Sequence, residues 1–443
     1  MKDAISVAKA IPVDYLWIDA LCILQDSAED KAQEVGRMAQ IYQQSILTIA
    51  AASSRDMTDG FLQMRRERPY PKEHHCEPGR VLTLPFRIAK GRFATVFLQC
   101  AICDFRHEDG QEPINERAWT LQEQAMAQRL LFYSSRTLRW SCPTLSCNLD
   151  DTPHILHGMS VTEFTKAPID KAKALDHWYT LVGLTCHRKL TLSADKLPAL
   201  AALAQQYNGV LGPGYFAGMW EYDFLRQLCW FELSYTSNYV AIAYDAVALD
   251  CEGNHVVRIP REYRAPTWSW ASSPDIVCSN HGLGVPACEI VHVSTTLKHN
   301  NNPYGEIVDG HLILRGKLRD AFVIGQSNKR DDRPLVWAND VATSAASADL
   351  YYADRNPEEF VVICQLDSQR HDTLEPLEHW NETQPVKCIL IYAKFGLLLR
   401  EAMTDDDNTR SYRRVGTWYD RDSYPDSLNR HFSDVTVAEI TIV

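Results

Sequence analysis

The chain lacks the marks of several large functional classes. It has no run of about 18 consecutive apolar residues, so we expect no membrane-spanning helix. Its first residues contain no compact apolar stretch ahead of a small-residue cleavage site, so we expect no secretory signal and a cytoplasmic location. No GxGxxG, P-loop, HExxH or GxSxG motif stands where its chemistry would need it, which disfavours nucleotide hydrolysis, Rossmann-type dehydrogenation and zinc proteolysis.

The sequence also has fewer cationic than anionic residues. The sequence has 45 Lys and Arg against 57 Asp and Glu, a net charge of −12. Sequence-independent binding to nucleic acid needs clustered cations, so we expect no nucleic-acid partner. The basic run formed by Arg65, Arg66 and Arg68 is typical of a solvated loop.

The 13 cysteines are scattered and odd in number, which indicates reduced thiols packed as small apolar groups. Cys100 and Cys103 form a CxxC, Cys142 and Cys147 follow, and residues 74–76 are His-His-Cys. A second CxxC is missing, and the spacings fit no zinc finger or ribbon. We therefore expect no bound metal and no cofactor.

What the chain does have is the composition of a folded protein. Its 443 residues are 45% hydrophobic and 23% charged, which favours about two to three globular domains. We predict an α/β domain over 1–150, a helical region over 151–238 and a β-rich region over 239–443, with a boundary near 150–168. Helices are expected at 172–186 and 195–207. From residue 239, apolar runs separated by Asn and Gly favour antiparallel strands.

Residues 14–52 are the most informative stretch. Their pattern predicts a strand at 15–19, a helix capped by Ser27 or Asp26, and a buried strand within 45–52, which together form a right-handed βαβ unit of a parallel sheet. Asp19, Cys22 and Gln25 cluster where the first strand ends, the place where open α/β sheets bind ligands. Further on we predict strands at 80–86, 95–98, 130–133 and 137–140 and a helix at 117–126.

Two ordered matches identify a family resemblance. The first comprises residues 15–26 (YLWIDALCILQD), Met38 with Ile41 and Tyr42, residues 47–51 and 59–60, and the second comprises residues 116–129 (ERAWTLQEQAMAQR). This region resembles the fungal heterokaryon-incompatibility (HET) domain. Shorter matches extend the resemblance along the chain, at 190–200, 215–220 with Trp230, 263–271, 302–305 and 312–316. The resemblance implies a fungal effector that kills fused cells when incompatible partners meet. This inference rests on similarity and specifies no mechanism.

The domain also resembles TIR domains in layout, which implies a flavodoxin-like parallel sheet with helices on both faces. TIR enzymes cleave the nicotinamide–ribose bond of NAD with a helical glutamate that follows a Trp by four residues. Trp119 and Glu123 have that spacing, which places both on one face of a helix. NAD is thus the candidate substrate. HET domains usually begin with a strand and loop of the type S-Y-x-W-G, and this sequence starts within the following helix, so we expect the central first strand to be missing.

Glu123 and Asp19 are the candidate catalytic residues, because a carboxylate near a ribose can stabilise an oxocarbenium-like charge. Each also has a structural interpretation. Glu123 could pair with Arg117 or Arg129 on the helix surface, and Asp19 could cap the following helix or pair with Arg117.

Trp119, Arg117, Gln25, Gln122 and Cys22 are the candidate substrate contacts. The aromatic ring could stack on a base, the amides could orient an amide or a water, and the thiol could act as a nucleophile if a base activated it. The structural alternatives are core packing for the tryptophan, solvated or structural amides, and a buried apolar thiol. Tyr263, Trp268 and Trp270 favour an aromatic staple at a domain interface over a binding site.

Three functions remain open from the sequence. A HET-type effector would act by NAD cleavage or by self-association. A stand-alone enzyme would act on a small metabolite in specialised metabolism, an alternative motivated by the lack of repeat or nucleotide-binding oligomerisation domains. An inactive interaction scaffold is the third reading, favoured by the missing strand.

Overall fold

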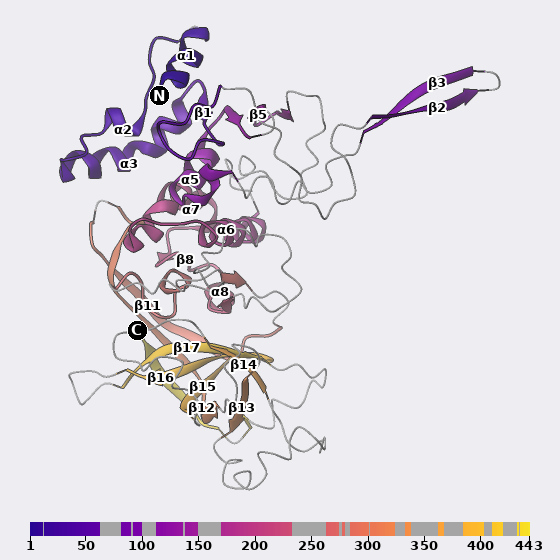
Figure 1. Ribbon diagram of the computed structural model, residues 1–443. Helices are drawn as coiled ribbons and strands as arrows, with labels where there is room; N and C mark the ends of the chain where they lie inside the picture. The colour runs from indigo at the N-terminus through magenta and orange to yellow at the C-terminus, as the bar shows by residue number, and fades with distance from the viewer. Residues whose placement is uncertain are drawn as a thin grey trace, which may run out of the picture. The chain divides into compact units, whose positions relative to one another are not determined.

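The computed structural model of the chain describes residues 1–11, 13–62, 81–89, 92–99, 112–135, 138–148, 170–232, 263–273, 277–279, 284–300, 302–323, 333–337, 362–366, 384–402, 410–419, 432–433 and 435–443. It divides into two compact units, one of Met1–Thr165 with Ala241–Ala246 and one of Lys166–Val240 with Val247–Val443 (Figure 1). The boundary predicted at 150–168 and the strand predicted from 239 lie outside the described residues.

The first unit combines helices with short strands. Its elements are α1 (Lys2–Ala10), α2 (Asp19–Cys22), α3 (Ala28–Gln44), β1 (Thr48–Ala50), β2 (Val81–Ala89), β3 (Arg92–Gln99), the 3₁₀ helix η1 (Pro113–Glu116), α5 (Trp119–Met126), β4 (Leu130–Tyr133), β5 (Leu138–Cys142) and β6 (Leu145–Asn148). The predicted cap of α3 is confirmed, since the Ser27 side chain accepts a hydrogen bond from the Asp30 N–H at 3.2 Å. The strands predicted at 80–86 and 95–98 are confirmed as β2 and β3, which form an antiparallel pair.

Four of these strands form one mixed sheet in the order β1-β4-β5-β6. β1 pairs with β4 in parallel, with Thr48 opposite Leu130. β4, β5 and β6 then follow as antiparallel neighbours. The described sheet is therefore mixed, with one parallel pair, and the prediction of a purely parallel sheet is wrong for these strands. The TIR-like fold stays a prediction.

The strand predicted at residues 15–19 is wrong. Residues 13–18 form no strand, and Asp19 instead opens the four-residue helix α2, where the Ile18 carbonyl accepts hydrogen bonds from the Leu21 and Cys22 N–H groups. Tyr15 is 93% exposed, so the apolar run is not buried between neighbouring strands as the pattern suggested. Among the described residues no strand pairs with this segment, and an apolar run without a pairing partner gains nothing from strand geometry.

α5 is held deep in the first unit. Six of its eight residues are buried, and Leu121 and Ala125 are fully so. At its start the Thr120 hydroxyl donates to the Ile114 carbonyl at 2.6 Å and caps the preceding turn. At its end it meets α3, where the Gln43 amide contacts the Met126 sulfur at 3.2 Å. This burial fixes the orientation of the two α5 residues that are not buried, Trp119 and Glu123.

The second unit begins with a helical layer and continues into strands. Its elements are α6 (Lys171–Cys186), η3 (Ser193–Lys196), η4 (Pro198–Leu200), α7 (Ala201–Leu211), β7 (Tyr215–Phe216), β8 (Met219–Trp220), α8 (Phe224–Gln227), β9 (Trp230–Glu232), η6 (Trp270–Ser272), β10 (Val277–Ser279), β11 (Glu289–Leu297), β12 (Ile307–Val323), β13 (Arg333–Trp337), β14 (Val362–Leu366), β15 (Gln384–Tyr392), β16 (Phe395–Glu401), β17 (Ser411–Tyr419) and β18 (Val437–Ile442). The helices predicted at 172–186 and 195–207 are confirmed as α6 and as η3, η4 and α7.

The C-terminal strands close into a barrel. The order β12-β13-β14-β17-β16-β15 returns to β12, because the end of the long strand β12 pairs with both β13 and β15 (Figure 1). The first half of β12 pairs instead with β11 and β18. Fully buried side chains fill this region, among them Leu312, Leu314, Ile389, Leu397 and Trp418. The predicted β-rich C-terminal region is therefore confirmed.

Residues 264–273 join the helical layer to the barrel. The Trp270 indole donates to the Gly218 carbonyl at 2.9 Å, and the Trp230 indole donates to the Trp268 carbonyl at 2.9 Å. On the barrel side, the Arg414 N–H donates to the Thr267 hydroxyl at 3.0 Å. Trp268 is fully buried and Trp270 nearly so, whereas Tyr263 is half exposed. The segment acts as the predicted aromatic staple, inside the second unit.

Candidate functional site

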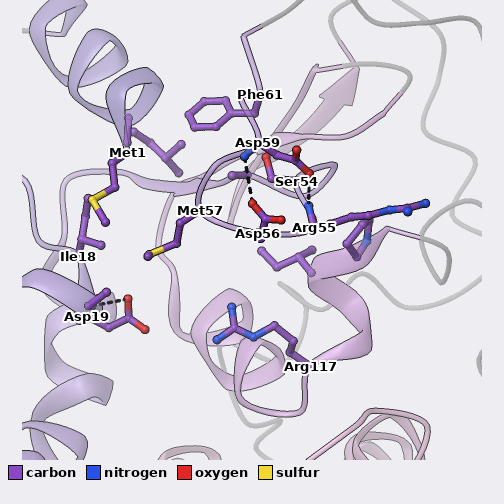
Figure 2. Close-up of a pocket in the computed structure, with 16 residues that line it drawn as sticks. Met1, Ile18, Asp19, Ser54, Arg55, Asp56, Met57, Asp59, Phe61 and Arg117 are labelled. Carbon is purple, nitrogen blue, oxygen red and sulfur yellow. Dashed lines mark hydrogen bonds between the residues drawn. The ribbon is translucent and has the colours of Figure 1, made fainter. Parts of the chain in front are cut away.

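A hollow of about 300 Å³ lies in the first unit at the carboxyl end of β1 (Figure 2). Its volume is at the lower end of the range for small-molecule sites. Apolar side chains from α1, β1 and η1 form much of its wall, and charged side chains stand at intervals among them. The lining residues are Met1, Ala4, Ile18, Asp19, Ala20, Ile49, Ala51, Ser54, Arg55, Asp56, Met57, Asp59, Phe61, Pro113, Ile114 and Arg117.

The loop that follows β1 supplies one wall and is built by short-range hydrogen bonds. The Asp56 carboxylate accepts from the Thr58 N–H at 2.7 Å and from the Asp59 N–H at 3.2 Å. Hydrogen bonds from Thr58 are the main reason that the pKa of Asp56 is lowered. The Asp59 carboxylate in turn accepts from the Arg55 N–H at 3.1 Å. These turns give the loop a defined shape, as an aspartate does in an Asx turn.

α1 holds the far end of this loop. One oxygen of the Asp3 carboxylate accepts the Phe61 N–H at 2.8 Å and the Leu62 N–H at 2.9 Å. Both bonds favour the ionised form, so the pKa of Asp3 is lowered. Because Phe61 also lines the hollow, α1 and the loop are tied together at its edge.

Asp19 and Arg117 both line the hollow, so the structure brings together one candidate catalytic residue and one candidate substrate contact. Asp19 begins α2, and its carboxylate accepts a hydrogen bond from the Ala20 N–H at 2.7 Å. This bond fits the structural interpretation, in which Asp19 caps the helix. The carboxylate can still accept further hydrogen bonds. Arg117 follows η1, and its guanidinium extends into the hollow toward the side where Asp19 lies (Figure 2). An anionic and a cationic group therefore face the same space.

Glu123 does not line the hollow. It is related to the lining residues Asp19 and Arg117 because all three act on the hydroxyl of Tyr42. The hydroxyl of Tyr42 donates a hydrogen bond to the Glu123 carboxylate. Burial raises the pKa of Tyr42, the negative charges of Glu123 and then Asp19 raise it further, and the positive charge of Arg117 opposes them. Both carboxylates therefore lie within electrostatic range of one hydroxyl.

α5 presents Trp119 and Glu123 on one side, as the spacing of four residues predicted. They are the two residues of this helix that are not buried. Gln122, one position before Glu123, is instead buried at 4% exposure. The neighbouring amide of Gln124 donates to the Asn115 side chain at 3.0 Å.

Gln25 and Cys22 lie on the exposed surface around α2 and do not line the hollow. The Gln25 amide donates to the Ile23 carbonyl at 3.0 Å and to the Asp19 carbonyl at 3.3 Å, so it closes the α2 turn. Cys22 is a free, exposed thiol rather than the buried apolar thiol of the structural interpretation.

Sequence reasoning missed two parts of this site. In the sequence, Tyr42 stands out only as part of the HET match, although a tyrosine near the end of an amphipathic helix carries a hydroxyl that needs a partner. The loop residues Ser54, Arg55 and Asp56 are not among the predicted site residues. The signal was their position directly after a buried strand, where ligand-binding loops of α/β sheets begin.

The described residues offer neither a metal site nor a membrane-spanning helix. Within these ranges no group of three or more His, Cys, Asp or Glu side chains could hold a metal ion. Cys100, Cys103 and residues 74–76 lie outside them. No helix in the described part of the chain combines the length and the apolar character needed to cross a bilayer.

Comparison with known proteins adds one finding. No curated protein and no solved structure matches the chain. The model of the family described as Heterokaryon incompatibility protein (HET) matches residues 1–123, which contain α1, the loop after β1, Arg117 and Glu123. Residues 1–123 are therefore a HET domain, and the resemblance seen in this part of the sequence is confirmed.

Proposed function

We propose that this protein is a heterokaryon-incompatibility-type effector that acts in fungal non-self recognition and leads to cell death. The observation that carries the proposal is the HET family match over residues 1–123. The match covers the hollow and both candidate carboxylates, so the proposed activity resides in the first unit. A cytoplasmic site of action follows from the same proposal, because fused cells share cytoplasm.

We further propose that the effector acts by cleaving the nicotinamide–ribose bond of NAD. Glu123 and Asp19 would supply negative charge near the ribose, where an oxocarbenium-like charge develops as the bond breaks. Arg117 extends into the hollow and would pair with a phosphate. Trp119, Gln25, Gln122 and Cys22 are more remote from the hollow, so we assign them the weaker role of outer contacts.

Expression of the full chain in a fungal host tests the effector role. We expect growth arrest with the wild-type chain and a fall in cellular NAD before viability is lost. Glu123→Gln keeps the size of the side chain and removes its charge, so it should abolish both effects at equal protein levels. Arg37→Gln serves as a control, because Arg37 is exposed on α3 and pairs only with Glu34 among the described ion pairs.

Two other mechanisms predict different results. An effector that signals by self-association would still arrest growth with Glu123→Gln, without loss of NAD. A stand-alone enzyme acting on a small metabolite would leave growth and NAD unchanged, and the hollow of about 300 Å³ would bind a compound other than NAD. An inactive scaffold would give neither arrest nor turnover.

A further inference from the structure

Tyr42 stands at a junction of three elements of the first unit. It lies in the last turn of α3, and its ring meets the Trp17 ring edge-on, with ring centres 5.8 Å apart and an interplanar angle of 78°. This contact fixes the ring against the segment that leads into α2. The hydroxyl at the far end of the ring then reaches Glu123 of α5.

The charges that act on the hydroxyl come from three different elements. Glu123 lies on α5, Asp19 opens α2, and Arg117 follows η1. Burial and the two carboxylates raise the pKa of Tyr42 far above the physiological range, with Arg117 acting in the opposite direction. The phenol therefore stays protonated at any pH at which the protein works, and it remains a donor.

We propose that Tyr42 is the positioning residue of the candidate site, and that its hydroxyl holds the Glu123 carboxylate ionised and oriented. The proposal rests on the proposed function, in which Glu123 acts on the substrate. A carboxylate that accepts a hydrogen bond is favoured in its charged form. Without the hydroxyl, Glu123 would have one donor fewer, and both its charge and its rotamer would be less well fixed.

The opposing interpretation is that Tyr42 only packs. Its ring contact with Trp17 would then be its whole contribution. Tyr42→Phe separates the two, because it keeps the ring and removes the hydroxyl. Tyr15→Phe is a matched control, since it makes the same chemical change at a side chain that is 93% exposed.

The first measurement does not depend on activity. The full chain carrying ¹³C-carboxyl-labelled glutamate is titrated by NMR, and the Glu123 signal is assigned by its loss in Glu123→Gln. We expect the Glu123 midpoint to rise in Tyr42→Phe and to stay unchanged in Tyr15→Phe. An unchanged Glu123 midpoint in Tyr42→Phe, with the fold intact by circular dichroism, would overturn the proposal.

The second measurement follows nicotinamide release from NAD. We expect Tyr42→Phe to lower kcat about tenfold with little change in KM and to move the acid limb of the pH profile upward. Tyr42→Phe added to Glu123→Gln should cause no further loss, because the hydroxyl acts through the carboxylate. Wild-type turnover in Tyr42→Phe would overturn the positioning role. If the wild-type chain releases no nicotinamide, only the proposed NAD cleavage is contradicted. The NMR titration then still decides the role of Tyr42.

Discussion

The guanidinium of Arg414 lies over the ring of Trp230, with its central carbon 3.4 Å from the ring centre. The same group donates to the Leu228 carbonyl at 2.8 Å and to the Trp230 carbonyl at 2.6 Å. Arg414 is only 1% exposed. A charge this deep is tolerated because carbonyls and an aromatic face replace the water it has lost. These contacts link β17 of the barrel to Trp230 at the start of β9 and to Leu228, which follows α8.

Arg414→Met should therefore destabilise the second unit. It leaves two buried carbonyls without their donor, which we expect to lower the free energy of unfolding by about 2–4 kcal/mol. Chemical denaturation followed by tryptophan fluorescence measures the change. Arg315→Met is the control, because Arg315 is exposed and pairs with Glu289 and Glu439 at the surface, where ion pairs contribute little. Equal effects of the two variants would contradict this account of Arg414.

Replacing either of two glycines by alanine should change the stability of the chain, in opposite directions. A Cβ at Gly396 would lie 2.3 Å from the Ile389 carbonyl oxygen and 2.4 Å from the Trp418 indole, neither of which can move freely. Gly396→Ala should therefore destabilise the chain by about 1–3 kcal/mol. Gly209 is exposed within α7, and a Cβ there meets nothing within 4 Å, so Gly209→Ala should stabilise by about 0.5–1 kcal/mol. The same denaturation experiment tests both signs.

The bond from Asp3 to the loop after β1 should depend on pH. Because the folded state lowers the pKa of Asp3 below its ordinary value of 3.8, the stabilisation is present above that value and is lost as pH falls through the lower, folded-state pKa. Protection of the Phe61 and Leu62 amides against hydrogen exchange should fall over that acidic range. Asp3→Ala should remove the extra protection at neutral pH, whereas Ser6→Ala on the same helix should not. Equal protection in Asp3→Ala and wild type would show that α1 does not hold the loop.

Cys142 should be a reactive thiol. The hydroxyl of Thr144, 3.4 Å from its sulfur, is the main cause that lowers the pKa of Cys142 to about 7. The rate of alkylation by iodoacetamide at Cys142, read by peptide mass spectrometry, should thus have its midpoint near pH 7. Thr144→Val should move the midpoint up toward the ordinary thiol value, and Ser146→Ala in the same hairpin should leave it in place. A midpoint that does not respond to Thr144→Val would remove this explanation.

Local signals in the sequence predicted much of the fold. Ser27 before an amphipathic run predicted where α3 begins. Apolar runs predicted strands where β2, β3 and the C-terminal strands lie. Residues 15–19 failed because strand formation depends on a neighbour to pair with, and an apolar alternating run carries no information about that neighbour. The parallel β1–β4 pair joins residues about 80 positions apart, which no local pattern specifies.

The site was predictable to a similar degree. The spacing of Trp119 and Glu123 predicted a shared helix side. Asp19 does line the hollow, although it begins the helix α2 and does not end a strand as predicted. Tyr42 could not be found this way, since its meaning depends on two carboxylates that lie far from it in sequence. Gln25 and Cys22 were near Asp19 along the chain, but the α2 turn directs them to the surface.

Nicotinamide release from NAD by the purified full chain tests the central claim most directly, namely that Asp19 and Glu123 form one active site. We expect turnover by wild type, a loss of about 100-fold or more in Asp19→Asn and in Glu123→Gln, and a double variant no slower than the slower single variant. Turnover that survives in both single variants, with the protein folded, would contradict the claim.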